Sequence, residues 1–156
     1  MNRRAEIQMT EQEIAAFLEE ERVAIATTMG PRGWPHSMPL WYLIRDGNIL
    51  TWTFRKAQKV KNLERNPKAT ILVEAGYDQY GELRGVMFEC EAKIHDDLDV
   101  VVEFATGMTS RYVLGGGEPT PEVVEVYRAQ APKRVVIEFT PVHTISWDHR
   151  KLSGGL

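Results

Sequence analysis

The segment WPHSMPLWYLIRDGNILTWTF, residues 34–54, decides the fold. Asp46-Gly47, near its middle, is a strong signal for a tight β-hairpin turn. The apolar and β-branched residues on both sides of this turn predict two antiparallel strands. Pro35 and Pro39 have no N–H to donate, so we expect the first strand to lie at a sheet edge or to carry a bulge.

Further elements are expected on both sides of this hairpin. Thr10 followed by Glu13 matches a capping box, Asp97 is a candidate helix N-cap, and Pro121 suits a first helical position. Asn66-Pro67 should end a helix. The expected helices are 10–21, 55–65 and two that begin near Asp97 and Pro121. The expected strands are 23–28, 34–44, 49–54, 69–73, 83–95, 134–140 and 143–147, with Pro141 dividing the last two.

The order of these elements defines the fold class. Most of the expected strands are joined by tight turns rather than by helices, which argues against a doubly wound parallel sheet. A mainly β protein with an antiparallel barrel and flanking helices fits better. A chain of 156 residues fits a single domain, 1–156, with its core at about 10–152 and loose ends that include the tail 153–156.

Composition excludes several classes of protein. The net charge of −3 argues against a general nucleic-acid binder. No stretch reaches the roughly 18–20 apolar residues that cross a bilayer, so no membrane association is expected. Acidic residues follow the basic first residues where a signal peptide would be apolar. The single cysteine, Cys90, cannot form an intramolecular disulfide, which favours a reducing cytoplasm.

The charge is unevenly distributed along the chain. The window 54–68 contains six basic residues and one acidic residue, a net charge of +5, so the rest of the chain carries −8. A basic island on an acidic protein suits a local anionic ligand. A solvated helix face explains the same pattern equally well.

Most familiar catalytic and metal-binding patterns are missing. The four histidines are scattered without an i, i+4 pair, so no metal site is expected. No Gly-x-Ser-x-Gly, Walker or Rossmann pattern is present. Cys90 lies at the centre of an expected strand, where a buried and inert thiol is usual. The catalytic residues are therefore unknown from the sequence; Tyr42 and His36 are the candidates for a general acid.

One site remains, where the strand 49–54 ends and the next helix is expected to begin. Backbone N–H groups at a helix start favour an anion, and Arg55 and Lys56 add charge and donors. This combination suits a phosphate group. Lys59 follows one helical turn later.

Aromatic and hydroxyl side chains precede this anchor. Thr51, Trp52 and Thr53 alternate along one strand, and Pro39 and Trp41 lie on the strand before it. Such residues beside a phosphate anchor suit a flat heterocycle with polar edges. The alternative is that both tryptophans are ordinary core aromatics.

Several segments together resemble a known family. The segments are 26–28 (ATT), 35–41 (PHSMPLW), 59–67 (KVKNLERNP), 83–86 (LRGV) and 146–152 (SWDHRKL). In order and spacing they resemble the pyridoxamine 5′-phosphate oxidase-like, FMN-binding split-barrel superfamily over about residues 10–152. The likeness is greatest to its flavin/deazaflavin oxidoreductase branch. This resemblance implies a six-stranded antiparallel split β-barrel and a homodimer with two cofactors in clefts between the subunits.

The resemblance also implies roles for individual residues. Arg55 and Lys56 match the basic pair that holds the cofactor phosphate, with Lys59 as a further candidate. Trp41 and the strand residues Thr51, Trp52 and Thr53 match positions near the ring system. Arg84 and Gly85 match a strand segment that approaches the ring from the other side, and Trp147 is a candidate contact from the second subunit.

The C-terminal segment decides between branches of the family. Pyridoxamine-phosphate oxidases end in a Trp-x-x-x-Arg-Leu-x-Pro type segment, whereas this chain has SWDHRKLSGG at 146–155. The resemblance therefore favours coenzyme F-420, a deazaflavin with a phosphate and an anionic tail, for hydride transfer to or from a small organic substrate. Lys61, Arg65 and Lys68 would suit that tail, or are simply solvated. The alternatives are an FMN-dependent oxidase or reductase and a non-catalytic protein that binds or stores flavin, haem or a tetrapyrrole.

Overall fold

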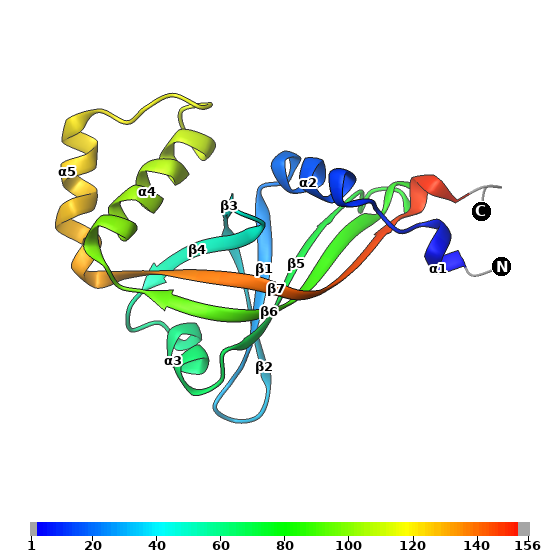
Figure 1. Ribbon diagram of the computed structural model, residues 1–156, viewed down its shortest axis with the longest axis horizontal. Helices are drawn as coiled ribbons and strands as arrows, with labels where there is room; N and C mark the ends of the chain where they lie inside the picture. Colours follow the sequence, from blue (N-terminus) through cyan, green and yellow to red (C-terminus); the bar gives the residue numbers. More distant parts are fainter. Residues whose placement is uncertain (1–2, 153–156) are drawn as a thin grey trace.

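The computed structural model describes residues 3–152 (Figure 1). The expected loose tail at 153–156 lies outside the described residues. The strands are β1 (Val23–Met29), β2 (Pro35–Trp41), β3 (Leu43–Arg45), β4 (Asn48–Phe54), β5 (Lys68–Ala75), β6 (Arg84–His95) and β7 (Arg134–Asp148). The helices are α1 (Arg3–Glu6), α2 (Glu11–Glu20), α3 (Gln58–Arg65), α4 (Leu98–Tyr112) and α5 (Pro121–Gln130). None of the helices in this part of the chain is long and apolar enough to span a membrane.

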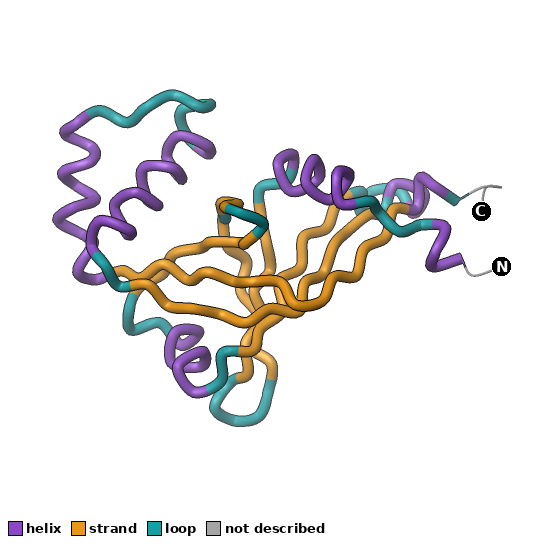
Figure 2. The backbone as a smooth tube through the Cα atoms, viewed as in Figure 1, coloured by secondary structure: helices purple, strands orange, loops and turns teal. Residues whose placement is uncertain are grey.

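All neighbouring strands are antiparallel, and their order in the sheet is β2-β1-β5-β6-β7-β4-β3. The two ends of this order, β2 and β3, are consecutive in the chain and separated only by Tyr42. The strand expected at 34–44 is therefore divided into β2 and β3, which form the two opposite edges of the sheet. The sheet curls into a split barrel with the helices outside it (Figure 2), which confirms the predicted fold class. The described part of the chain has seven strands in this sheet rather than the six that the resemblance implied.

Tyr42 divides the strand because its backbone is bonded elsewhere. Its N–H donates to the Tyr112 hydroxyl (3.0 Å), and its C=O accepts from that same hydroxyl (2.7 Å). The Tyr42 side chain is fully buried, and its own hydroxyl donates to the Leu18 C=O at 2.7 Å. Both polar groups that a strand ladder would use are thus taken by the end of α4.

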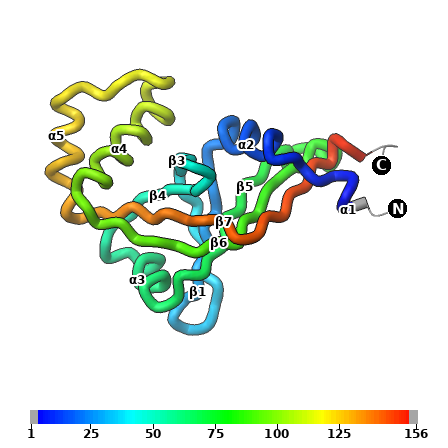
Figure 3. Tube along the Cα trace, in the orientation of Figure 1, coloured from blue at the N-terminus to red at the C-terminus, as the bar shows by residue number. Residues whose placement is uncertain are grey.

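Two hydrophobic clusters hold the sheet. The larger one fills the barrel with inward-facing residues of the strands, such as Ile71, Val86 and Ile137. Helices α2 and α3 add side chains to it near opposite ends of β1, as the chain trace in Figure 3 shows. The smaller cluster lies between α4 and the outer faces of β4 and β7, with Phe104 and Val136 at its centre.

Three of the four predicted helix starts are confirmed. The Glu13 N–H donates to Thr10 Oγ1 (3.2 Å), and the Thr10 N–H donates to Glu13 Oε2 (2.6 Å), which completes the capping box. Asp97 accepts from two N–H groups at the start of α4, and Pro121 is the first residue of α5.

The prediction of two strands divided at Pro141 was wrong, because β7 continues through this residue. Cys90 on β6 lies opposite Pro141, whereas Glu89 lies opposite His143, so Val142 is an extra residue in β7. This β-bulge absorbs the position at which proline cannot donate to the ladder.

The predicted helix at 55–65 also begins later than expected, at Gln58. The Arg55 N–H donates to the Lys133 C=O (2.9 Å), and the Ala57 N–H donates to the Phe54 C=O (2.9 Å). Arg55 and Lys56 therefore lie in a turn between β4 and α3 rather than in the helix.

Candidate functional site

The barrel is split between β2 and β4. Strand β3 pairs with β4 only from Asn48 to Leu50, so from Thr51 to Phe54 β4 pairs with β7 alone. Strand β2 pairs only with β1, and no ladder joins β2 to β4 anywhere in residues 3–152. The two strands leave Tyr42 and its hairpin in diverging directions (Figure 1). Such unpaired strand edges present N–H and C=O groups to a ligand.

The predicted residues of β4 point to opposite sides. Thr51 and Thr53 are buried on the inner face of β4, and within the described chain Thr51 Oγ1 has no hydrogen-bond partner. Trp52 faces outward beneath the helices, 6.2 Å from the Phe104 ring, with the Arg134 guanidinium 4.6 Å from its ring centroid. Only the backbone of this segment therefore faces the split directly.

On the other side of the split, Trp41 and Pro39 lie on β2. The Trp41 indole stacks on the Tyr112 ring, with centroids 4.5 Å apart and an angle of 14° between the planes. Trp41 is nevertheless 50% exposed, and Pro39 is exposed as well. Trp41 is therefore not the core aromatic of the alternative interpretation, since it presents accessible aromatic surface.

The three predicted basic residues, Arg55, Lys56 and Lys59, differ in burial. Arg55 is exposed and forms an ion pair with Asp96 (3.2 Å), and Lys56 is exposed in the same turn. Lys59 is only 9% exposed, and its Nζ donates to Thr53 Oγ1 (3.2 Å). Arg55 and Lys56 thus remain accessible anchors, whereas Lys59 points into the barrel.

Burial lowers the pKa of Lys59 below its ordinary value. Between this lowered pKa and the ordinary one near 10.4, the unfolded chain binds more protons, so the free energy of unfolding rises with pH. Lys59→Met should remove this rise and stabilise the protein at pH 7 by about 1 kcal/mol, since the buried charge disappears. Urea denaturation from pH 7 to 10 measures the effect. Lys61→Met is the matched control, because it removes the same charge from the exposed face of α3 and should leave the stability at pH 7 nearly unchanged.

Arg84, Gly85 and Trp147 lie far from this anchor in the same chain. Arg84 forms an ion pair with Glu20 (3.2 Å) beside α2, and Gly85 is the cross-strand partner of Trp147. Trp147 lies thirteen positions after Arg134, which is beside the anchor, and this is roughly 40 Å along an extended strand. One chain does not bring these two groups of predicted residues together.

Gly85 allows the Trp147 ring to pack on the backbone of β6. A Cβ atom at this position would lie 2.7 Å from Cη2 of Trp147, closer than side chains pack. Gly85→Ala should therefore displace the indole and destabilise the protein by about 1–3 kcal/mol. Thermal unfolding together with tryptophan emission measures both changes. Gly81→Ala is the control, because a Cβ there meets nothing within 4 Å.

The two candidate acids differ in availability. The Tyr42 hydroxyl is buried and bonded to backbone oxygens of α2 and its C-cap, and burial raises the pKa of Tyr42. This side chain is structural rather than catalytic. His36 lines a small pocket of about 120 Å³ near Trp34, and its Nδ1 has no partner among the described residues.

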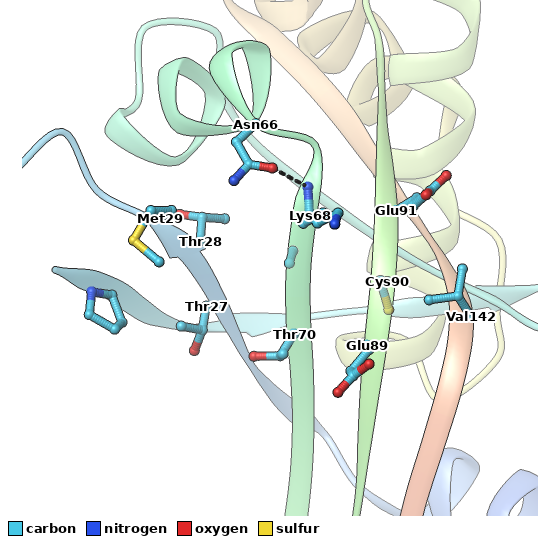
Figure 4. Close-up of a pocket in the computed structure, with 12 residues that line it drawn as sticks. Thr27, Thr28, Met29, Asn66, Lys68, Thr70, Glu89, Cys90, Glu91 and Val142 are labelled. Carbon is cyan, nitrogen blue, oxygen red and sulfur yellow. Dashed lines mark hydrogen bonds between the residues drawn. The ribbon is translucent and has the colours of Figure 1, made fainter. Parts of the chain in front are cut away.

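A groove of about 550 Å³ on the outer face of β1, β5 and β6 was not predicted from the sequence (Figure 4). The side chains of Thr27, Thr70 and Glu89 line its floor, and Met29 and Val142 lie at opposite sides. Of the residues predicted to contact the cofactor, Lys68, a candidate for the anionic tail, lines this groove, whereas the predicted phosphate and ring contacts do not. Alternation of outward polar side chains is common on strands, so no sequence signal singled it out.

Comparison with known proteins identifies the family. The family model described as pyridoxamine 5′-phosphate oxidase matches residues 10–148, and the chain belongs to this family. Among curated proteins, no relative matches.

Solved structures agree with the fold. The crystal structure of the conserved hypothetical protein Rv2991 from Mycobacterium tuberculosis is 38% identical, with 98% of this chain and 93% of that chain covered and a TM-score of 0.88. An F420 reductase is 22% identical, with 83% of this chain and 93% of that chain covered and a TM-score of 0.63. HutZ, the haem storage protein of Vibrio cholerae, is 17% identical, with 89% of this chain and 96% of that chain covered and a TM-score of 0.66. The last two show the shared fold alone.

Proposed function

We propose that the chain is an oxidoreductase that binds a deazaflavin, coenzyme F-420, in the split between β2 and β4. The observation that carries this proposal is the arrangement around the split. The Trp41 ring offers accessible aromatic surface on one side, a β4 edge without a partner borders the other, and Arg55 and Lys56 are accessible where β4 ends.

The residues present suit a phosphate-bearing flat ring. Arg55 and Lys56 would hold the phosphate through charge-assisted hydrogen bonds. The N–H and C=O groups of the β4 edge would bind the polar edge of the ring, and the helices around the barrel would help to exclude water. The bound cofactor supplies the hydride-transfer chemistry, while these residues bind and orient it.

The basic residues around α3 favour a deazaflavin over FMN. Lys61 and Lys68 are exposed, and Arg65 donates to the Met29 C=O at 2.7 Å, at the end of β1. They would attract the anionic tail of coenzyme F-420, which FMN lacks. The similarity in fold to an F420 reductase is compatible with this choice.

A homodimer would complete the site. Arg84, Gly85 and Trp147 are remote from Arg55 within one chain, so they would approach the ring from the second subunit. Exposed apolar residues lie on the outward faces of β1 and β7, where a second copy would cover them: Val23, Met29, Val142 and Ile145.

A cofactor titration tests the proposal. The purified protein would be titrated with coenzyme F-420 and, separately, with FMN, and quenching of tryptophan emission would be followed. Micromolar or tighter binding of coenzyme F-420 with weak FMN binding is the expected result. A preference for FMN would move the protein to the FMN-dependent oxidases or reductases, and binding of neither would refute a flavin-type cofactor.

A non-catalytic binding or storage protein is the second candidate. The observation that favours it is that Tyr42, one of the two candidate acids, is engaged in hydrogen bonds to backbone oxygens. The shared fold with a haem storage protein is compatible with this role. Tight binding of a chromophore without turnover of any screened substrate would favour it.

A further inference from the structure

Arg55 is held by an acidic residue of another strand. Its Nη1 lies 3.2 Å from Asp96 Oδ2, and both side chains are substantially exposed. Asp96 follows directly after the last residue of β6, whereas Arg55 follows the last residue of β4. The ion pair therefore joins two segments that are remote in sequence.

The direction of this ion pair relative to the split is informative. Strand β7 lies between β6 and β4 in the sheet, and the split lies on the other side of β4. To reach Asp96, the Arg55 guanidinium extends across the start of β7. It is thus directed away from the split, where the proposed cofactor phosphate would lie.

Asp96 is the more firmly placed of the two partners. On one side, His95 Nε2 lies 2.6 Å from Glu138 Oε2 of β7, and Glu138 also accepts from Asn48 at 2.6 Å. On the other side, Asp97 caps α4 through the N–H groups of its first turn. Arg55, in contrast, is part of a turn and has a long side chain. A competing anion would therefore move Arg55 and leave Asp96 in place.

The strength of the ion pair permits such competition. Exposed ion pairs of this kind contribute little free energy. A phosphate dianion that also contacts Lys56 can displace the Asp96 carboxylate. A ligand without phosphate lacks the anionic oxygens that would form charge-assisted hydrogen bonds with Arg55. The Asp96 carboxylate would in addition repel any anion nearby.

We propose that Asp96 is a positioning residue that holds Arg55 away from the split until a phosphate-bearing cofactor displaces it. This inference rests on the proposed function of the split as a cofactor site. Asp96 thereby lowers the affinity for the phosphate-bearing form of the cofactor and leaves the affinity for its phosphate-free form unchanged.

Substitution of Asp96 by asparagine tests the inference. Titrations would use FMN and riboflavin, and coenzyme F-420 with its phosphate-free chromophore. Asp96→Asn should bind the phosphate-bearing member of each pair roughly three- to tenfold more tightly, and the other member equally well. In an Arg55→Ala background, Asp96→Asn should raise the affinity for the phosphate-bearing cofactor much less, because Asp96 acts on this affinity through its ion pair with Arg55.

Glu103→Gln is the matched control, because Glu103 forms a comparable exposed ion pair with Arg45 (2.8 Å) away from the split. Glu103→Gln should change neither the affinity for the phosphate-bearing ligand nor that for the phosphate-free ligand. If wild type binds a phosphate-bearing cofactor and Asp96→Asn binds it no more tightly, the inference is wrong and the proposed function stands. An equal gain for the phosphate-free ligand would also contradict it. If neither protein binds any of the four ligands, the proposed function fails and the inference fails with it.

Discussion

Replacing both exposed cations at the end of β4, in Arg55→Ala/Lys56→Ala, is expected to weaken binding of the phosphate-bearing cofactor about 100-fold. Each residue would contribute charge-assisted hydrogen bonds to the phosphate, and the loss of one such interaction costs about 1.5–3 kcal/mol when the partner is charged. Exposure reduces this figure, so about tenfold for each residue is expected. Quenching of tryptophan emission during titration measures the affinity.

The fold should survive this double substitution. Neither side chain belongs to either hydrophobic cluster, and the Arg55 backbone bond to the Lys133 C=O remains. The control Lys93→Ala/Arg128→Ala removes the same charge from exposed positions of β6 and α5. Unchanged cofactor affinity in the Arg55/Lys56 double variant, or an equal loss in this control, would contradict the phosphate assignment.

The largest effect on stability is expected from Arg111→Ala. The Arg111 guanidinium donates to the C=O groups of Leu18 (2.8 Å) and Glu21 (3.0 Å), and more weakly to those of Glu19 and Tyr42. It also lies 4.9 Å from the Tyr42 ring centroid. Its loss would leave the carbonyl groups at the end of α2 without this donor and remove a cation that packs on the Tyr42 ring, at a cost of about 2–4 kcal/mol.

Chemical denaturation at pH 7 measures this change. Arg45→Ala is the matched control, because its ion pair with Glu103 is exposed and should cost at most about 1 kcal/mol. Arg111→Lys should lie between the two variants, since one ammonium group cannot reproduce the forked guanidinium contacts. A loss in Arg111→Ala no larger than that in Arg45→Ala would show that the guanidinium is dispensable.

Local signals predicted much of the fold. The Asp46-Gly47 turn, the Thr10 capping box and Pro121 all act within a few residues, and each is where it was expected. Prolines 35 and 39 lie on β2, which is an edge of the sheet as their missing N–H groups require. Short-range chemistry of this kind is visible in a single sequence.

Long-range contacts explain what the sequence could not reveal. The division of the strand at Tyr42 depends on a hydroxyl from Tyr112, and the late start of α3 depends on the Lys133 C=O. For the site, the basic turn and Trp41 were predicted, but the alternation of β4 turns Trp52 away from Thr51 and Thr53. The ion pair of Arg55 with Asp96 joins residues 41 positions apart and carries no local signature.

The bonds between Tyr42 and Tyr112 also bear on the order of events during folding. These residues are 70 positions apart, so their hydrogen bonds close a long loop of the chain. Contacts across such long loops require entropy to be lost before they stabilise anything. We therefore expect the contact of Tyr42 with Tyr112, which separates β2 from β3, to form late in folding and to depend on docking of α4.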